Sequence, residues 1–69
     1  MAYLAYRGLD SAGNGRGGEV TVQSPWAFVN AAYQAGWRKL TVWVPGRPES
    51  IVGQILTEPD GRRTWWGKP

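Results

Sequence analysis

Indole rings and basic side chains recur together in the second half of the chain, and they are its main candidates for chemistry. Lys39, Thr41 and Trp43 stand at every second position, so in a strand they share one face. Trp and Arg are the favoured anchors of protein interfaces, whereas bases stack on rings and cations follow phosphates in single-strand binding. The predicted partner-binding residues are Trp43, Trp65, Trp66, Arg62, Arg63 and Lys39.

Three functions fit this set of residues. The first is a protein–protein interaction or inhibitor module with an unidentified protein partner. The second is a nucleic-acid-binding protein that adds phosphate contacts from Arg16, Arg38 and Arg47 to the same face. The third is a self-assembling homo-oligomer that buries its rings between subunits. The rings also have a purely structural use, because side chains alternate in a strand and one of Trp65 and Trp66 must point into the fold.

The sequence offers few residues that could form a catalytic site. The chain has no His and no Cys, which excludes Ser-His and Cys-His nucleophile pairs, disulfides and the usual zinc sites. No carboxylate stands in an apolar segment that would raise its pKa for acid–base work. The sequence therefore predicts a protein that is not an enzyme and needs no cofactor and no metal. The five carboxylates are Asp10, Glu19, Glu49, Glu58 and Asp60.

A glycine-rich stretch over residues 8–18 contains the spacing G-x-G-x-x-G at Gly13, Gly15 and Gly18. The dinucleotide-binding form of this pattern requires a helix directly after the glycines, and here a strand is expected. The kinase form requires further catalytic segments that 69 residues cannot hold. We therefore expect a flexible loop, in which backbone amides and Arg16 are free to meet a phosphate.

Composition limits the class of protein further. Six Arg and two Lys against five acids give a net charge of +3, which permits an anionic partner. Five Trp, three Tyr and one Phe supply bulk for a small core. No run approaches the ~20 apolar residues that span a bilayer, so the expected location is the cytoplasm and no membrane partner is expected. The abundance of Gly, Ala, Arg, Val, Pro and Trp is typical of a GC-rich bacterial or bacteriophage genome.

The elements that must position these residues follow from the pattern. Ser24 and Pro25 mark the start of a helix that runs to about Ala35, where Gly36 ends it. Short alternating segments separated by turns predict a single α+β domain over residues 1–69, with a mostly antiparallel sheet, one helix on one face and the order β-β-α-β-β-β. Residues 67–69 are expected to form a tail. The predicted strands cover 2–7, 19–23, 37–44, 51–58 and 62–66, with a turn over 45–50.

The predicted helix has a wide apolar surface. Only Ala27, Asn30 and Gln34 fall on an arc suited to solvent. Trp26 and Trp37, which flank the helix, are expected to fill the core rather than to bind a ligand.

Overall fold

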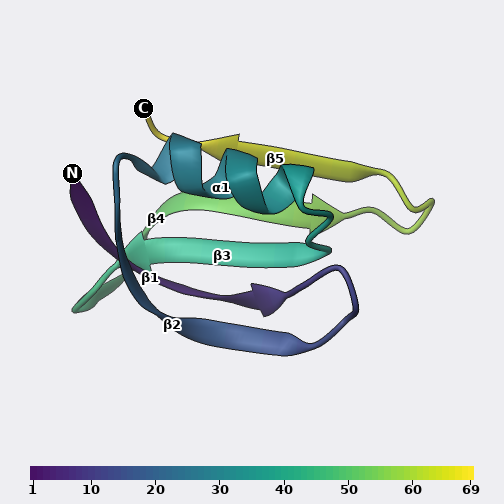
Figure 1. Ribbon diagram of the computed structural model, residues 1–69, viewed down its shortest axis with the longest axis horizontal. Helices are drawn as coiled ribbons and strands as arrows, with labels where there is room; N and C mark the ends of the chain where they lie inside the picture. The colour runs from purple at the N-terminus through teal and green to yellow at the C-terminus, as the bar shows by residue number, and fades with distance from the viewer.

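The computed structural model describes residues 1–69 and confirms the predicted α+β class and element order. One helix lies across one face of a five-stranded sheet, as Figure 1 shows. The helix has ten residues, and no helix of the structure is both long and apolar enough to cross a bilayer. The elements are β1 (Ala2–Leu9), β2 (Gly15–Val22), α1 (Pro25–Gln34), β3 (Lys39–Val44), β4 (Arg47–Thr57) and β5 (Arg63–Gly67).

The sheet has the strand order β2-β1-β3-β4-β5, and every neighbouring pair is antiparallel. Short turns join β1 to β2, β3 to β4 and β4 to β5, as expected for antiparallel neighbours. The connection from β2 to β3 passes through α1, because β1 lies between those two strands (Figure 1). This crossover brings β1 beside β3, two strands that are far apart in the sequence.

The start and end of α1 follow the predicted signals. The Ser24 hydroxyl oxygen accepts a hydrogen bond of 3.1 Å from the amide of Ala27, and Pro25 occupies the first turn. Gly36 has a φ of 88°, which a residue with a side chain rarely adopts, and it ends the helix.

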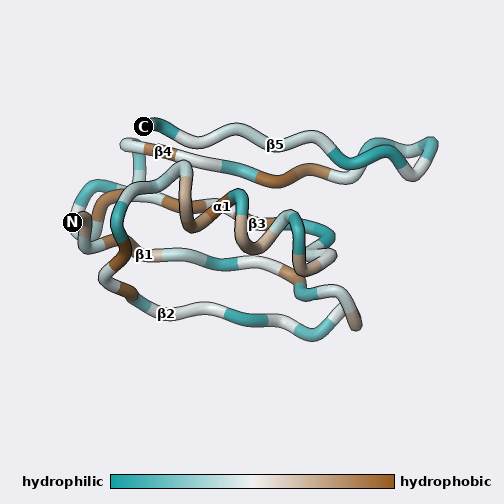
Figure 2. Tube along the Cα trace, turned by 45° about the horizontal axis from the view of Figure 1, so that its top comes forward, coloured by the Kyte–Doolittle hydropathy of each residue, from teal (hydrophilic) through white to brown (hydrophobic).

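The core lies between α1 and the central strands. Leu40, Val42 and Ile55 from the sheet and Val29 from the helix are fully buried. Hydrophobic segments of the trace accordingly gather on α1, β3 and β4 in Figure 2. Gly53 lets the helix approach closely, because a Cβ there would lie 2.6 Å from Val29 Cγ2.

The loop predicted over residues 8–18 is shorter in the structure. Strand β1 continues to Leu9 and β2 begins at Gly15, so most of the glycine-rich stretch is paired strand. The connecting loop is closed by Asp10, whose carboxylate accepts hydrogen bonds from the amides of Asn14 at 2.9 Å and Ala12 at 3.0 Å. The bond from Asn14, then that from Ala12 and the nearby Arg16, hold the pKa of Asp10 below its ordinary value. Glycine gives a weak strand signal in sequence, but pairing with β1 supplies the missing stability.

Two other boundaries also differ from the prediction. The turn between β3 and β4 is confined to Pro45 and Gly46, and β4 begins at Arg47. The expected tail is bonded to the fold: Lys68 donates to the carbonyl of Val52 at 2.9 Å and accepts from the amide of Trp26 at 2.9 Å. These bonds hold the C-terminal residues against the first turn of α1.

Candidate ligand-binding face of the sheet

The sheet has one face covered by α1 and one face without a helix, which we call the open face. Because Leu40 and Val42 point into the core, their neighbours Lys39, Thr41 and Trp43 point to the open face, as the alternation predicted. The ladder places Arg7 of β1 directly beside Thr41. The row across the sheet continues from Thr41 to Gln54 and then to Trp66.

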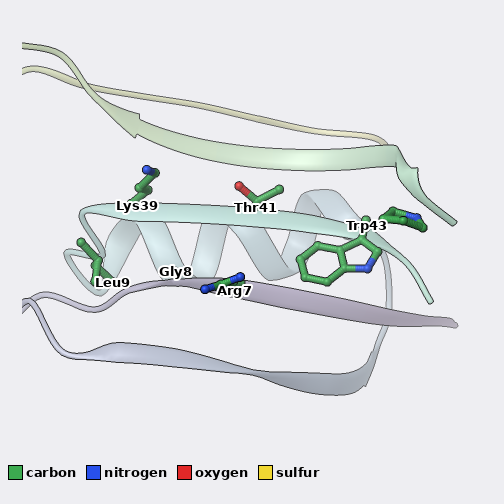
Figure 3. A pocket seen from close by; sticks show the side chains of 7 residues that line it. Arg7, Gly8, Leu9, Lys39, Thr41 and Trp43 are labelled. Atoms are coloured by element: carbon green, nitrogen blue, oxygen red, sulfur yellow. The ribbon is translucent and has the colours of Figure 1, made fainter. Parts of the chain in front are cut away.

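A shallow groove of about 560 Å³ lies on the open face along β1 and β3. Figure 3 shows the side chains of Lys39, Thr41, Trp43 and Arg7 on one side of the ribbon, with the helix behind the sheet. Two further hollows adjoin this groove. One shares Leu9 and Lys39 with it, and the other shares Arg7 and Trp43. We call the three together the basic groove. The 560 Å³ part of the basic groove, along β1 and β3, is lined by Arg7, Gly8, Leu9, Lys39, Thr41, Trp43 and Pro48.

The basic groove is lined by cations and by no carboxylate. Its charged lining residues are Arg7, Arg16, Arg38 and Lys39. Arg16 has a carboxylate partner, Asp10, at 3.4 Å. The other three form no salt bridge, so their charge is not neutralised within the protein. An anion that enters the groove meets several positive groups at once.

Glu19 lies on the open face, beside Ala5 on the neighbouring strand. It accepts a hydrogen bond from the hydroxyl of Tyr3. That hydrogen bond, then partial desolvation and the charge of Glu19, raise the pKa of Tyr3. Glu19 is therefore engaged with Tyr3 and lies outside the lining of the groove.

Trp43 is positioned by an irregularity between β3 and β4. The pairing register shifts on both sides of Trp43, between Val42 and Trp43 and between Trp43 and Val44. A bulge bends a strand and redirects its side chains, and here the start of β4 brings Pro48 into the lining beside Trp43. In Figure 3 the indole extends over the gap between β3 and β1. One face of a half-buried ring is thus presented to the groove.

The C-terminal pair of tryptophans divides between the two faces, as predicted. Trp66 is 44% exposed on the open face, and its indole nitrogen donates to Gln54 Oε1 at 3.3 Å. Trp65 points to the helix side and packs against Trp26 and Tyr33, with ring centroids 5.6 Å and 5.8 Å apart. Trp65 therefore lies away from the basic groove.

The predicted arginine pair is also divided. Arg63 donates to the carbonyl oxygens of Tyr33 and Trp37, each at 2.9 Å, and its guanidinium lies 4.1 Å above the Tyr33 ring. It therefore closes the C-terminal end of α1. Arg62 lies in the β4–β5 turn and pairs with Asp60 at 2.8 Å. Neither arginine lines the basic groove, which separates them from Trp43 and Lys39.

The predicted phosphate contacts divide in the same way. Arg16 and Arg38 line the basic groove, whereas Arg47, at the start of β4, does not. Trp37 is half-buried against the core, as expected. Trp26 is not a core residue, because 48% of it is exposed. A Cβ at Gly67 would lie 2.8 Å from the Cα of Trp26, so the backbone of β5 occupies the space beneath this residue.

Arg7 is a cation of the basic groove that was not among the binding residues predicted from the sequence. The alternation of the first strand does place it on one face with Tyr3 and Ala5. What decides its role is the pairing of β1 with β3, which brings it beside Thr41, between Lys39 and Trp43.

No protein-family model, curated protein or solved structure matches this chain. No three acidic side chains lie close enough together to hold a metal ion. The cations and the indole of the basic groove are suited to holding an anionic ligand with a flat ring.

Proposed function

We propose that this protein is a non-catalytic binding module that holds single-stranded nucleic acid in the basic groove. The observation that carries the proposal is the combination of an accessible indole, Trp43, with cations and no carboxylate in the lining. Both cations are exposed: Arg7 is paired with Thr41 across the two strands, and Lys39 lies two residues before Thr41 on β3. A base stacked on the indole of Trp43 would place its phosphates near these two side chains.

The shape of the open face favours a single strand over a duplex. Bases inside a duplex are stacked on each other, so an indole finds no free base to stack on. Reading a duplex instead requires an element that enters a groove about 12 Å wide. Five strands at ~4.8 Å spacing make a sheet about 19 Å across, which is too broad to enter.

Charge argues against a face-to-face dimer. Two copies packed through their open faces would bring Arg7 and Lys39 of both chains together in a lining that contains no carboxylate. Leaving such charges unpaired away from water is costly. A polyanion satisfies the same groups without that penalty.

Two of the residues predicted to bind a protein partner, Trp65 and Arg63, are engaged within the fold. Trp65 packs within the fold, and Arg63 is bonded to the end of α1. Of the predicted set, Trp43, Trp66 and Lys39 remain together on the open face, with Arg7 added. This smaller set has the composition of a single-strand platform, in which rings alternate with cations.

The test is the salt dependence of binding to a fluorescein-labelled eight-nucleotide oligothymidylate, measured by fluorescence anisotropy. Neutralisation of three or four phosphates predicts a log–log slope of about −2 to −3, since each phosphate on a single strand contributes about −0.7. Arg7→Gln should make the slope shallower by one such step. Trp43→Ala should weaken binding by roughly 1–3 kcal/mol with little change in slope.

The matched control is Trp65→Phe, which keeps a ring on the helix face and should leave affinity unchanged. No binding at low salt would refute the proposal, as would a slope near zero. Equal affinity for a duplex of the same length would refute the preference for a single strand.

A further inference from the structure

The basic groove extends well beyond the ring on which the proposed function depends. We infer that the bound strand runs along β3 from Trp43 to Arg38, so that the site takes an oligonucleotide and not a single nucleotide. This inference rests on the proposed function and adds the course and length of the ligand. Its basis is the hollow at the start of β3, which is lined by Arg38, Lys39 and Leu56 and adjoins the groove beside Trp43, with which it shares Leu9 and Lys39.

Arg38 is held in place at this end by its backbone. Its amide donates to the carbonyl of Leu9 at 3.0 Å, and its own carbonyl accepts a hydrogen bond from the Thr57 hydroxyl. These contacts tie Arg38 to both neighbouring strands. The point from which the Arg38 side chain extends is therefore fixed relative to β1 and β4.

The guanidinium of Arg38 has no anionic partner in the protein. It lies toward the β1–β2 loop, since a Cβ on Gly13 would be 3.5 Å from its Nη1 atom. The loop carboxylate, Asp10, is already bonded to two backbone amides and to Arg16. Arg38 is therefore available to a phosphate at the far end of the groove from Trp43.

The distance between the two ends sets the length of the ligand. Arg38 is the bend residue directly before β3 and lies five residues from Trp43, a span of at most about 17 Å at ~3.3 Å per residue. At ~3.4 Å per stacked nucleotide this corresponds to about five nucleotides, and to fewer if the strand is extended. A dinucleotide held at Trp43 falls short of Arg38.

A second route leads from Arg7 across β2. There the hollow is lined by glycines and by Arg16, which already pairs with Asp10. Gly15 offers a clean test of this route, because a Cβ there meets no atom within 4 Å and a side chain would extend into open space. Gly15→Leu therefore obstructs the route across β2 without disturbing the fold.

The experiment compares labelled oligothymidylates of two and eight nucleotides on the full-length chain at low salt, by fluorescence anisotropy. Arg38→Gln should weaken binding of the eight-nucleotide ligand by about three- to five-fold and leave the two-nucleotide ligand unchanged. Arg7→Gln should weaken both. Arg62→Gln removes the same charge outside the groove and is the matched control, expected to change neither. Gly15→Leu should also change neither.

The outcomes separate the inference from the proposed function. If the wild-type chain binds neither ligand, the proposed function fails and the inference fails with it. If the wild-type chain binds with the expected dependence on Arg7 while Arg38→Gln leaves the longer ligand unaffected, only the course along β3 is refuted. A loss of binding in Gly15→Leu would place the strand across β2 instead and would also overturn the inference.

Discussion

We predict that Arg63 stabilises the folded state and does not contact the ligand. Its removal should therefore greatly lower the free energy of unfolding of the domain. Its guanidinium donates to two carbonyl oxygens at the end of α1, each at 2.9 Å, and lies 4.1 Å above the Tyr33 ring. Hydrogen bonds to a charged group contribute about 1.5–3 kcal/mol, and a cation–π contact adds about 0.5–1 kcal/mol. Both bonds leave the same Nη1 atom, so we count them as one charged hydrogen bond, and Arg63→Ala should lower the free energy of unfolding by about 2–4 kcal/mol. A domain of this size has a margin of only roughly 3–5 kcal/mol.

The assay is urea denaturation of wild type and variants, followed by far-ultraviolet circular dichroism. The neighbouring Arg62 is the matched control, because its ion pair with Asp60 lies in an exposed turn. Exposed pairs contribute about 0–1 kcal/mol, so Arg62→Ala should unfold nearly as the wild type does. Equal stabilities of Arg63→Ala and wild type, within about 0.5 kcal/mol, would refute the assignment of Arg63 to the fold.

Three further predictions concern the packing at Gly53, the helix cap at Ser24 and the loop carboxylate of Asp10. Gly53→Ala adds a Cβ 2.6 Å from a helix side chain and should cost about 1–3 kcal/mol in urea denaturation, whereas Gly15→Ala, which meets nothing, should cost nothing measurable. Ser24→Ala removes the helix cap and should lower stability by about 1 kcal/mol, and an unchanged melting temperature would contradict the cap. The hydrogen bond from the amide of Asn14 is the main reason that the pKa of Asp10 is lower in the folded protein. The ionised carboxylate therefore stabilises the fold at pH values above its unfolded pKa. This contribution is lost as the pH falls through the lowered pKa of the folded state. Asp10→Asn should therefore be less stable than wild type at neutral pH and equal to it in strong acid, and a constant difference across the pH range would count against this assignment.

Local patterns were sufficient for the fold class and for the order of the elements along the chain. The cap at Ser24, the stop at Gly36 and the alternation around Val42 each depend on neighbours in sequence, and each prediction is confirmed. Alternation also required that one of Trp65 and Trp66 face inward. Which of the two does so depends on the register of β5 against β4, which pairs Trp65 with the buried Ile55.

The composition of the site could be predicted only in part, because contacts between distant segments assemble it. Trp43 and Lys39 share a strand, so alternation alone placed them together. Arg7 joins them only through the pairing of β1 with β3, which no local pattern encodes. Arg63 appeared free in sequence, and it is engaged because the end of α1 stops above β5.

The most direct test of the binding face is a titration of the ¹⁵N-labelled protein with an eight-nucleotide oligothymidylate, followed by nuclear magnetic resonance. The five tryptophans each give an indole N–H signal, so the rings report separately. Binding in the basic groove should shift the indole signal of Trp43 and the amides of Arg7 and Lys39, while the signals of Trp26 and Trp65 stay in place. Shifts confined to the helix side, or none at saturating ligand, would contradict the account.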